Sequence, residues 1–271
     1  MRIRRLGWAG LEIEAEGGVA VVDLFEDVGW MAQFVGEPRG ALPSPEHEGA
    51  VDVALVTHLH SDHTDHDAIA RALGPDGVLL RPERARGLGT ETVALEVAER
   101  GLAKHGIAQR VVAPWETVEL GPFALSAVPA VDGLGDPQVS WVIAAEGRRI
   151  LHAGDTLYHG SWWLIAGRHG PLDAVFFPVN GAVLDFPNRQ PASPVPADMD
   201  PAQAAAAAHV LQAGVAVPIH YDALHHPPAY VQVDDPAGAF VAAASELDVA
   251  TRVLEVGETL ELAPRAAVAA G

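Results

Sequence analysis

The segment Thr-His-Leu-His-Ser-Asp-His at residues 57–63 carries three histidines and an aspartate within six positions. It directly follows an apolar run that is typical of a buried strand. Alternate residues of an extended chain point the same way, so His58 and His60 can bind one metal ion together. Asp62 and His63 follow the expected turn and can face a second ion nearby. Imidazole and carboxylate ligands suit Zn²⁺ and also accept Mn²⁺ or Fe²⁺, so the segment predicts a metal site rather than a polar loop.

The composition favours a folded chain that acts on small molecules. With 271 residues, of which 49% are hydrophobic, the chain can bury a sizeable core, and no linker divides it, so we expect one domain over residues 1–271. Its 36 acidic and 17 basic residues give a formal charge of −19, which would repel a phosphate backbone. We therefore expect a small-molecule substrate and no nucleic acid, while assembly into a homo-oligomer stays open.

Cysteine is absent from the chain, so any metal ion must be held by His, Asp and Glu side chains. Glu12, Glu14 and Glu16 interrupt any apolar leader sequence. No run of about 18 apolar residues is present that could cross a bilayer. These features predict a cytoplasmic protein without a membrane partner.

Hydrophobic periodicity and turn residues predict a mixed α/β chain. Strands are expected at residues 3–13, 19–24, 51–56, 78–80, 110–113, 117–120, 123–128, 139–144, 149–152, 174–177 and 215–219, with a closing hairpin at 251–262. Helices are expected at residues 67–73, 91–105, 201–213 and 236–246, and an irregular connection at 26–49. The order of these elements suggests two sheets packed face to face with helices outside.

Three further candidate ligands follow expected strands, at the position where α/β sheets usually carry their sites. Asp155 comes after a strand that runs into a glycine turn, and its two oxygens can bridge two cations. His220 and Asp132 each come just after a strand as well. Taken alone, Asp155 and His220 each fit a structural role better, as a turn cap and as a satisfied histidine. A centre with two ions, however, needs about five to seven protein ligands.

Together these segments resemble the metallo-β-lactamase-fold hydrolases, and within them the branch of the ascorbate-6-phosphate lactonases. The resemblance runs through most of the chain and includes Leu-Gly-Trp-Ala-Gly at 6–10, the histidine segment, Ile-Leu-His-Ala-Gly-Asp-Thr at 150–156, Phe-Phe-Pro-Val-Asn-Gly at 176–181 and Val-Pro-Ile-His-Tyr-Asp at 217–222. The histidine segment is specific by itself, and the others gain weight from their order and spacing. The family implies a four-layer αββα sandwich with its site at one edge between the sheets.

Carried over by position, the resemblance implies two divalent metal ions. The implied ligands are His58 and His60 for the first ion, Asp62, His63 and His220 for the second, and Asp155 as the bridge. The family's third ligand to the first ion is a histidine that this chain lacks, and Asp132 is the nearest candidate to replace it. An aspartate there shifts the metal preference from Zn²⁺ towards Mn²⁺, and iron stays open.

Other residues near these segments carry weaker expectations. Trp8 departs from the small residue or histidine expected after the opening Leu-Gly. Asp65 and His152 are expected to orient ligands from behind, with structural roles as the alternative. The remaining histidines near the motifs are expected at the surface, namely His159, His225 and His226.

The resemblance and the ligand set predict a metal-dependent hydrolase in which a metal-bound hydroxide attacks a small ester, lactone or related substrate. Asp62 would orient that hydroxide or take its proton. No Ser-His-Asp arrangement or Gly-x-Ser-x-Gly elbow indicates a side-chain nucleophile. The alternatives are a small-molecule phosphodiesterase of the same fold, an iron-dependent redox protein and a metal-binding protein without catalysis.

No motif identifies the substrate. The candidate walls of a pocket are Trp30, Phe34, Trp162, Trp163 and the loop at residues 182–200. Within that loop, Arg189 is the candidate contact for an anionic substrate.

Overall fold

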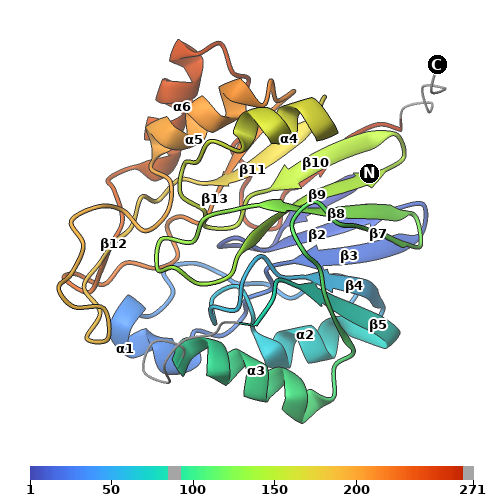
Figure 1. Ribbon diagram of the computed structural model, residues 1–271, viewed down its shortest axis with the longest axis horizontal. Coiled ribbons are helices and arrows are strands. Elements are labelled where there is room, and N and C mark those ends of the chain that lie inside the picture. Colours follow the sequence, from blue (N-terminus) through green and yellow to red (C-terminus); the bar gives the residue numbers. More distant parts are fainter. Residues whose placement is uncertain (85–92, 265–271) are drawn as a thin grey trace.

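The computed structural model describes residues 1–84 and 93–264 and is built in four layers. Two sheets pack face to face, and helices cover the outer face of each sheet (Figure 1). This arrangement confirms the expected αββα sandwich. Residues 91 and 92 of the expected helix at 91–105 lie outside the described residues.

The first sheet carries the histidine segment. Its strands are β1 (Arg2–Arg5), β2 (Leu11–Ala15), β3 (Gly18–Val22), β4 (Val51–Leu55), β5 (Leu73–Arg81), β6 (Gln109–Val111) and β15 (Thr259–Glu261). In the described part of the chain they lie in the order β15-β1-β2-β3-β4-β5-β6. The strands from β3 to β6 are parallel, so their carboxyl ends meet at one edge. The histidine segment follows β4 and begins at that edge.

The second sheet supplies the remaining candidate ligands. Its strands are β7 (Thr117–Leu120), β8 (Phe123–Pro129), β9 (Val139–Ala145), β10 (Arg148–His152), β11 (Ala174–Pro178) and β13 (Ala216–Ile219). They lie in the order β13-β11-β10-β9-β8-β7, with β10, β11 and β13 parallel. Asp132, Asp155 and His220 follow β8, β10 and β13, as expected. A separate small sheet pairs β12 (Val183–Leu184) with β14 (Tyr230–Val231).

Helices cover both outer faces (Figure 1). The helical segments are η1 (Gly29–Met31), α1 (Ala32–Val35), α2 (His66–Ala72), α3 (Val93–His105), α4 (Trp162–His169), α5 (Pro201–Val210) and α6 (Pro236–Glu246). The helices α2 and α3 pack on the first sheet, and α4, α5 and α6 pack on the second. Helix α5 begins where Asp200 and Gln203 form a capping box around Pro201 in the first turn.

Alternating side chains of the strands fill the space between the sheets. Along β9, Val139, Trp141 and Ile143 join the core between the sheets, while Val142 packs beneath the helices on the other face. The Trp141 indole also donates a hydrogen bond to the Val56 carbonyl at 3.0 Å, directly before the histidine segment. The core therefore sets the separation of the two sheets next to the site.

Several of the expected elements are wrong in their extent. The strand expected at 78–80 is β5, which already begins at Leu73, where the expected helix at 67–73 was to end. The strand expected at residues 3–13 is two strands, β1 and β2, because the chain reverses at Gly7, whose φ is +85°. The closing hairpin expected at 251–262 is a single strand, β15, which pairs with β1 at the edge of the first sheet. Local sequence could not reveal that this segment pairs with the distant first strand.

Some elements were not expected from the sequence. The irregular connection at 26–49 contains the short helical segments η1 and α1, and residues 162–169 form helix α4. The apolar run Trp-Trp-Leu-Ile-Ala gives no clear helical period, yet Trp162 and Ile165 share the buried face of α4. No helix within residues 1–84 and 93–264 is long and apolar enough to cross a membrane.

Gly154 lies directly before Asp155 in a left-handed conformation, with φ of +70°. A Cβ atom there would lie 2.7 Å from the Thr57 hydroxyl oxygen and 2.8 Å from its Cβ. We expect Gly154→Ala to lower the free energy of unfolding by roughly 2–5 kcal/mol, from backbone strain and overlap together. Urea denaturation measures the change.

Gly167 offers the matched control for this substitution. It is exposed within α4, and an added Cβ would meet nothing within 4 Å. Gly167→Ala should leave stability unchanged or raise it by up to about 1 kcal/mol. Equal stability of the two variants would contradict the account of Gly154.

Candidate metal centre

The histidine segment and the loops after β8, β10 and β13 meet at one edge of the two sheets. Among the described residues, seven side chains at this edge form two adjacent groups, and the potential ligand atoms within each group lie within 4.8 Å of one another. The first group is His58, His60, Asp132 and Asp155, and the second is Asp62, His63 and His220. The structure thus brings together every side chain that the sequence named as a ligand, and their binding of metal stays a prediction.

Asp155 lies between the two groups with one carboxylate oxygen towards each. Its Oδ1 is 3.3 Å from His58 Nε2, and its Oδ2 is 3.7 Å from His63 Nε2. Two ligand atoms on one tetrahedral ion, each bonded at about 2.1 Å, are separated by about 3.4 Å. The contacts of Asp155 are close to that separation on both sides, which is the geometry that a bridging carboxylate requires.

The histidines point ring nitrogens at each other. His58 Nε2 lies 2.8 Å from His60 Nδ1, and His63 Nε2 lies 3.1 Å from His220 Nε2. Asp62 Oδ2 adds an oxygen 3.5 Å from His63 Nε2 and 3.6 Å from His220 Nε2. Neutral imidazole nitrogens and carboxylate oxygens that converge in this way need a proton or a cation between them.

Buried carboxylates make this centre a strong binder of positive charge. Burial lowers the pKa of His60, but the charge of Asp132 and the hydrogen bond to Asp136 outweigh that effect and raise the pKa to about 10. Burial also lowers the pKa of His220, and the hydrogen bond to Asp198 helps to reverse the shift and raise the pKa to about 10. Divalent cations would supply the same charge to the same donors, so the residues present fit a metal centre.

Asp132 caps a turn and also belongs to the first group. Its Oδ2 accepts the backbone N–H groups of Leu134 and Asp136 at 2.9 and 2.7 Å, which fixes the orientation of the carboxylate. The residue is only 7% exposed and so does not point into solvent. Asp132 also lies beside His58 and His60, so its replacement of the missing histidine stays a prediction.

Asp23 orients the histidine segment and was not identified from the sequence. Its Oδ2 accepts hydrogen bonds from His63 Nδ1 at 2.8 Å and from the Thr57 hydroxyl at 2.7 Å. Burial raises the pKa of Asp23, but the charge of His63 and a hydrogen bond with it outweigh burial and lower the pKa. A carboxylate on Nδ1 leaves Nε2 of His63 directed at the centre. The available signal was a carboxylate placed directly after the buried strand β3.

Two loop carboxylates orient other histidines in the same way. Asp198 Oδ2 lies 3.0 Å from His220 Nδ1, and Asn180 Oδ1 is 3.3 Å from the same nitrogen. Asp136 Oδ2 lies 2.9 Å from His60 Nε2. Both aspartates come from loops without a strand or helix period, so a single sequence carries no signal for these roles.

Trp8 has a specific place in the second group. Its indole Nε1 donates to Asp62 Oδ2 at 3.1 Å, and its ring centroid lies 4.0 Å from that of His220. Its carbonyl also accepts the His220 backbone N–H at 2.9 Å. Trp8 and His220 both have positive φ, of 39° and 58°, a conformation that costs energy in residues other than glycine. The departure from a small residue thus provides a donor for Asp62.

Asp65 has the structural role that was the alternative expectation. Its side chain accepts the Ala68 N–H at 3.0 Å and caps helix α2. It also accepts the backbone N–H groups of Glu26 and Asp27, each at 3.1 Å. Asp65 therefore fixes the start of the 26–49 connection and does not orient a candidate ligand.

His152 is buried behind the centre and contacts it only indirectly. Its Nε2 lies 2.7 Å from the Ala9 carbonyl oxygen, and its Nδ1 accepts the Gly154 N–H at 3.2 Å. Burial lowers the pKa of His152. Its Nδ1 is 3.8 Å from Asp23 Oδ2, so any effect on a ligand passes through Asp23.

The expectation that the other histidines lie at the surface holds for His226, which is exposed, while His225 is half-buried. His159 is half-buried as well, and its ring stacks on Trp162 with the centroids 4.1 Å apart. Burial lowers the pKa of His159 to about 4. None of the three belongs to the two groups described above.

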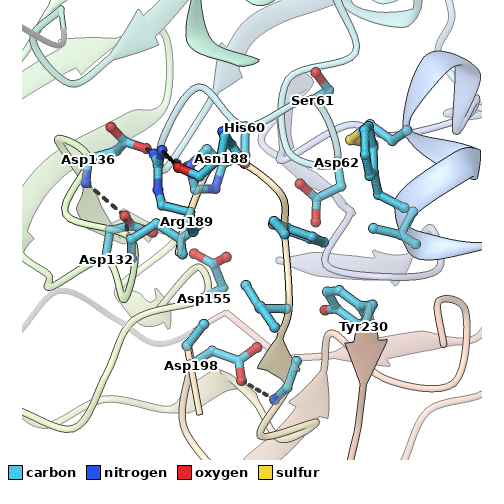
Figure 2. A pocket seen from close by; sticks show the side chains of 18 of the residues that line it. His60, Ser61, Asp62, Asp132, Asp136, Asp155, Asn188, Arg189, Asp198 and Tyr230 are labelled. Atoms are coloured by element: carbon cyan, nitrogen blue, oxygen red, sulfur yellow. Dashed lines mark hydrogen bonds and ion pairs between the residues drawn. The ribbon is translucent and has the colours of Figure 1, made fainter. Parts of the chain in front are cut away.

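A cavity of about 280 Å³ opens beside the two groups (Figure 2). As expected, Trp30, Phe34 and residues of the 182–200 loop line it. The expectation is wrong for Trp162, which is buried beneath α4 against Phe177, and for Trp163, which is 60% exposed on the outside of the same helix.

Arg189 lines the cavity, as expected for that loop. Its guanidinium lies 3.8 Å from Asp136 Oδ2, within ion-pair distance. Figure 2 shows the side chains of Arg189 and Asp136 side by side near His60. The positive charge of Arg189 is therefore partly neutralised by a carboxylate of the same site.

Comparison with known families agrees with the fold. Residues 20–221 match the family model described as Beta-lactamase superfamily domain. The chain belongs to this superfamily.

The curated relatives narrow this assignment. A UPF0173 metal-dependent hydrolase from Opitutus terrae is 31% identical over 220 residues, which cover 78% of this chain and 82% of the relative. Another from Methanopyrus kandleri is 28% identical over 269 residues, 96% of this chain and 100% of the relative. The chain is accordingly a member of the UPF0173 family.

A solved structure shows the same architecture. The structure of a possible metal-dependent hydrolase from Veillonella parvula aligns with a TM-score of 0.72 at 14% identity, covering 97% of this chain and 99% of the other. At that identity the likeness concerns the fold alone.

We expect Trp8→Phe to weaken metal binding, because it keeps an aromatic ring beside His220 and removes the N–H that holds Asp62. Loss of a contact that orients a ligand typically costs 10–100-fold in affinity, and we expect a loss of about that size. Calorimetric titration with Zn²⁺ measures it. Trp115→Phe, the same change at a residue that packs against Arg168 away from the centre, is the control and should leave affinity unchanged.

Asp132 provides a test of the first site. If its carboxylate is a ligand, Asp132→Ala should reduce the bound metal from two ions per chain towards one, and Asp132→His should raise Zn²⁺ affinity. Elemental analysis of protein purified without a metal resin, followed by Zn²⁺ titration, measures both effects. Two variants that bind metal like the parent protein would show that Asp132 only caps its turn.

Proposed function

We propose that the chain is a metal-dependent hydrolase that cleaves a small ester or lactone with two divalent ions. The observation that carries this proposal is the position of Asp155, whose two oxygens face the histidines of the two donor groups. Membership of a family whose curated members are named metal-dependent hydrolases supports the same reaction class. The cavity beside these donors gives a substrate access to them.

The chain's own residues would divide the work. His58, His60 and Asp132 would hold the first ion, and the second group would hold the other, with Asp155 shared. Ions in such positions polarise a substrate oxygen and lower the pKa of water to roughly 7.

Asp62 is the residue best placed to accept a proton from the attacking water. Burial raises its pKa, but the charge of His63 outweighs burial and keeps the pKa well below the ordinary value. The carboxylate is therefore ionised at neutral pH and can accept a hydrogen bond from a water that attacks the substrate. Trp8 fixes its orientation through Oδ2.

A side-chain nucleophile has no support at this site. Ser61 lines the cavity, but its buried Oγ has no hydrogen-bond partner within the described structure, so no base activates it. We therefore propose water as the attacking group. A lactone or an ester is a suitable substrate, because attack by one water molecule on its carbonyl carbon is enough for hydrolysis and no side-chain nucleophile is needed. The resemblance to lactonases puts lactones first among these.

Asp62→Ala and Asp155→Ala should each lower kcat/KM for a hydrolysed ester or lactone by at least about 10³-fold. The first removes the carboxylate that would accept a proton from the attacking water, and the second removes the carboxylate that would bridge the two ions. Ser61→Ala, at the adjacent position, should stay within a few-fold of the parent. Turnover should stop on chelation and return with Zn²⁺ or Mn²⁺.

The same preparation separates the alternatives. A burst of product or trapping of an acyl-enzyme would contradict attack by water. Phosphodiester cleavage without ester cleavage would favour a phosphodiesterase. Oxygen consumption by the iron-loaded protein would favour an iron-dependent redox protein. Two bound metals without turnover of any of these substrates would favour a metal-binding protein.

A further inference from the structure

We propose that the cavity selects a neutral substrate with an apolar chain and disfavours anionic and phosphorylated substrates. This inference rests on the proposed hydrolase function and concerns the substrate class of that site. It is carried by the contrast between the polar floor of the cavity and its apolar walls.

The walls come from two segments that lie far apart in the sequence and meet at the cavity. One is formed by η1 and α1 and contributes Trp30 and Phe34, and the other follows β12 and contributes Phe186. The ring of Phe34 meets both aromatic neighbours edge to face, with centroids 6.1 Å from Trp30 and 6.1 Å from Phe186. Three aromatic side chains thus form a continuous apolar wall.

The core does not bury these aromatic rings completely. Trp30 is 41% exposed, and Phe34 and Phe186 are only partly buried although they lie against the core. Met31, Val35, Leu134 and Leu184 add to the apolar lining. Partly exposed apolar side chains gathered around one opening are typical of a ligand-binding surface.

The polar part of the cavity does not attract an anion. Five carboxylates line it, and among the described lining residues Arg189 is the only Lys or Arg. Two divalent ions held at the donor groups, together with one guanidinium, would balance those five negative charges, so no net positive charge would remain for a substrate phosphate or carboxylate. Arg189 moreover lies within ion-pair distance of Asp136. Apart from Arg189, the histidines and a few neutral polar groups, an anionic group on the substrate would meet apolar side chains and carboxylates.

The size of the cavity limits the chain. Its volume of about 280 Å³ corresponds to about nine groups of the size of a water molecule, at roughly 30 Å³ each. An ester group with an acyl chain of about six to eight carbons fills that space. The reacting carbonyl would lie at the donor groups and the chain between Phe34 and Leu184.

The test is a chain-length series of p-nitrophenyl esters from acetate to octanoate, assayed with the metal-loaded protein. Burial of each added methylene should raise kcat/KM about fourfold until the cavity is full. Mono-p-nitrophenyl suberate has the same chain length as the octanoate with a terminal carboxylate, and its kcat/KM should be at least tenfold lower. A flat or falling series, or a suberate ester as good as the octanoate, would overturn the inference.

Variants of the wall locate the effect. Phe34→Ala should flatten the chain-length series, and Phe186→Ala on the segment after β12 gives a second test if the first variant folds poorly. Leu184→Arg should raise kcat/KM for the suberate ester relative to the octanoate by at least tenfold. Trp163→Ala removes an exposed aromatic residue on the outside of α4 and should leave the series as steep as in the parent protein. An unchanged slope in both phenylalanine variants would overturn the assignment of the wall.

Binding of 2-nonanone, a neutral ketone that cannot be hydrolysed, separates this inference from the hydrolase proposal. Calorimetry should show that the protein binds 2-nonanone and that Phe34→Ala weakens this affinity at least tenfold. The affinity for octanoate, which carries a negative charge, should be lower than that for the ketone. Such binding without turnover of any ester would overturn the proposed function and support the preference of the cavity. Ester turnover without a chain-length effect, and no binding of the ketone, would support the hydrolase and overturn the inference.

Discussion

The concentration of carboxylates and imidazoles where two sheets end is the constraint on which the rest of the site depends. The histidine segment comes from the first sheet and Asp155 from the second, and they approach to 3.3 and 3.7 Å. Neither sheet carries a complete set of donors, so the centre exists only when the sheets are packed. The core between them, which holds Trp141 against the carbonyl of Val56, therefore determines the separation of the donors.

Groups behind the donors convert this proximity into a defined geometry. Asp23 and Asp198 each accept a hydrogen bond from the far nitrogen of a histidine, and Trp8 donates to Asp62. These contacts direct the remaining nitrogens and oxygens at one small volume, which a flexible set of side chains would not do. The positive φ angles of Trp8 and His220 show that the fold also accepts backbone strain to hold this arrangement.

Chemistry and selectivity lie on different parts of the chain. The donors follow the strands of the two large sheets, whereas the aromatic wall comes from η1 and α1 and from the segment after β12. Figure 1 shows α1 and β12 near the same end of the molecule, beyond the ends of the strands. Changes in these short segments would alter the lining of the cavity, because they supply its aromatic side chains.

The sequence by itself determined the αββα class through its family resemblance and seven side chains that meet at the site. Residues 57–63 carry four of these side chains in a local pattern, and Asp132, Asp155 and His220 follow strands whose apolar runs are visible in the chain. The tertiary structure alone decided the contacts of Asp198 with His220 and of Trp8 with Asp62, which join residues far apart in sequence. It also decided that Trp162 lies on the buried face of α4, in the core beneath that helix, and does not line the cavity. The physical reason is that hydrophobic periodicity in the sequence indicates which face of a helix or strand is buried. Which other element covers that face depends on how the sheets and loops pack in three dimensions.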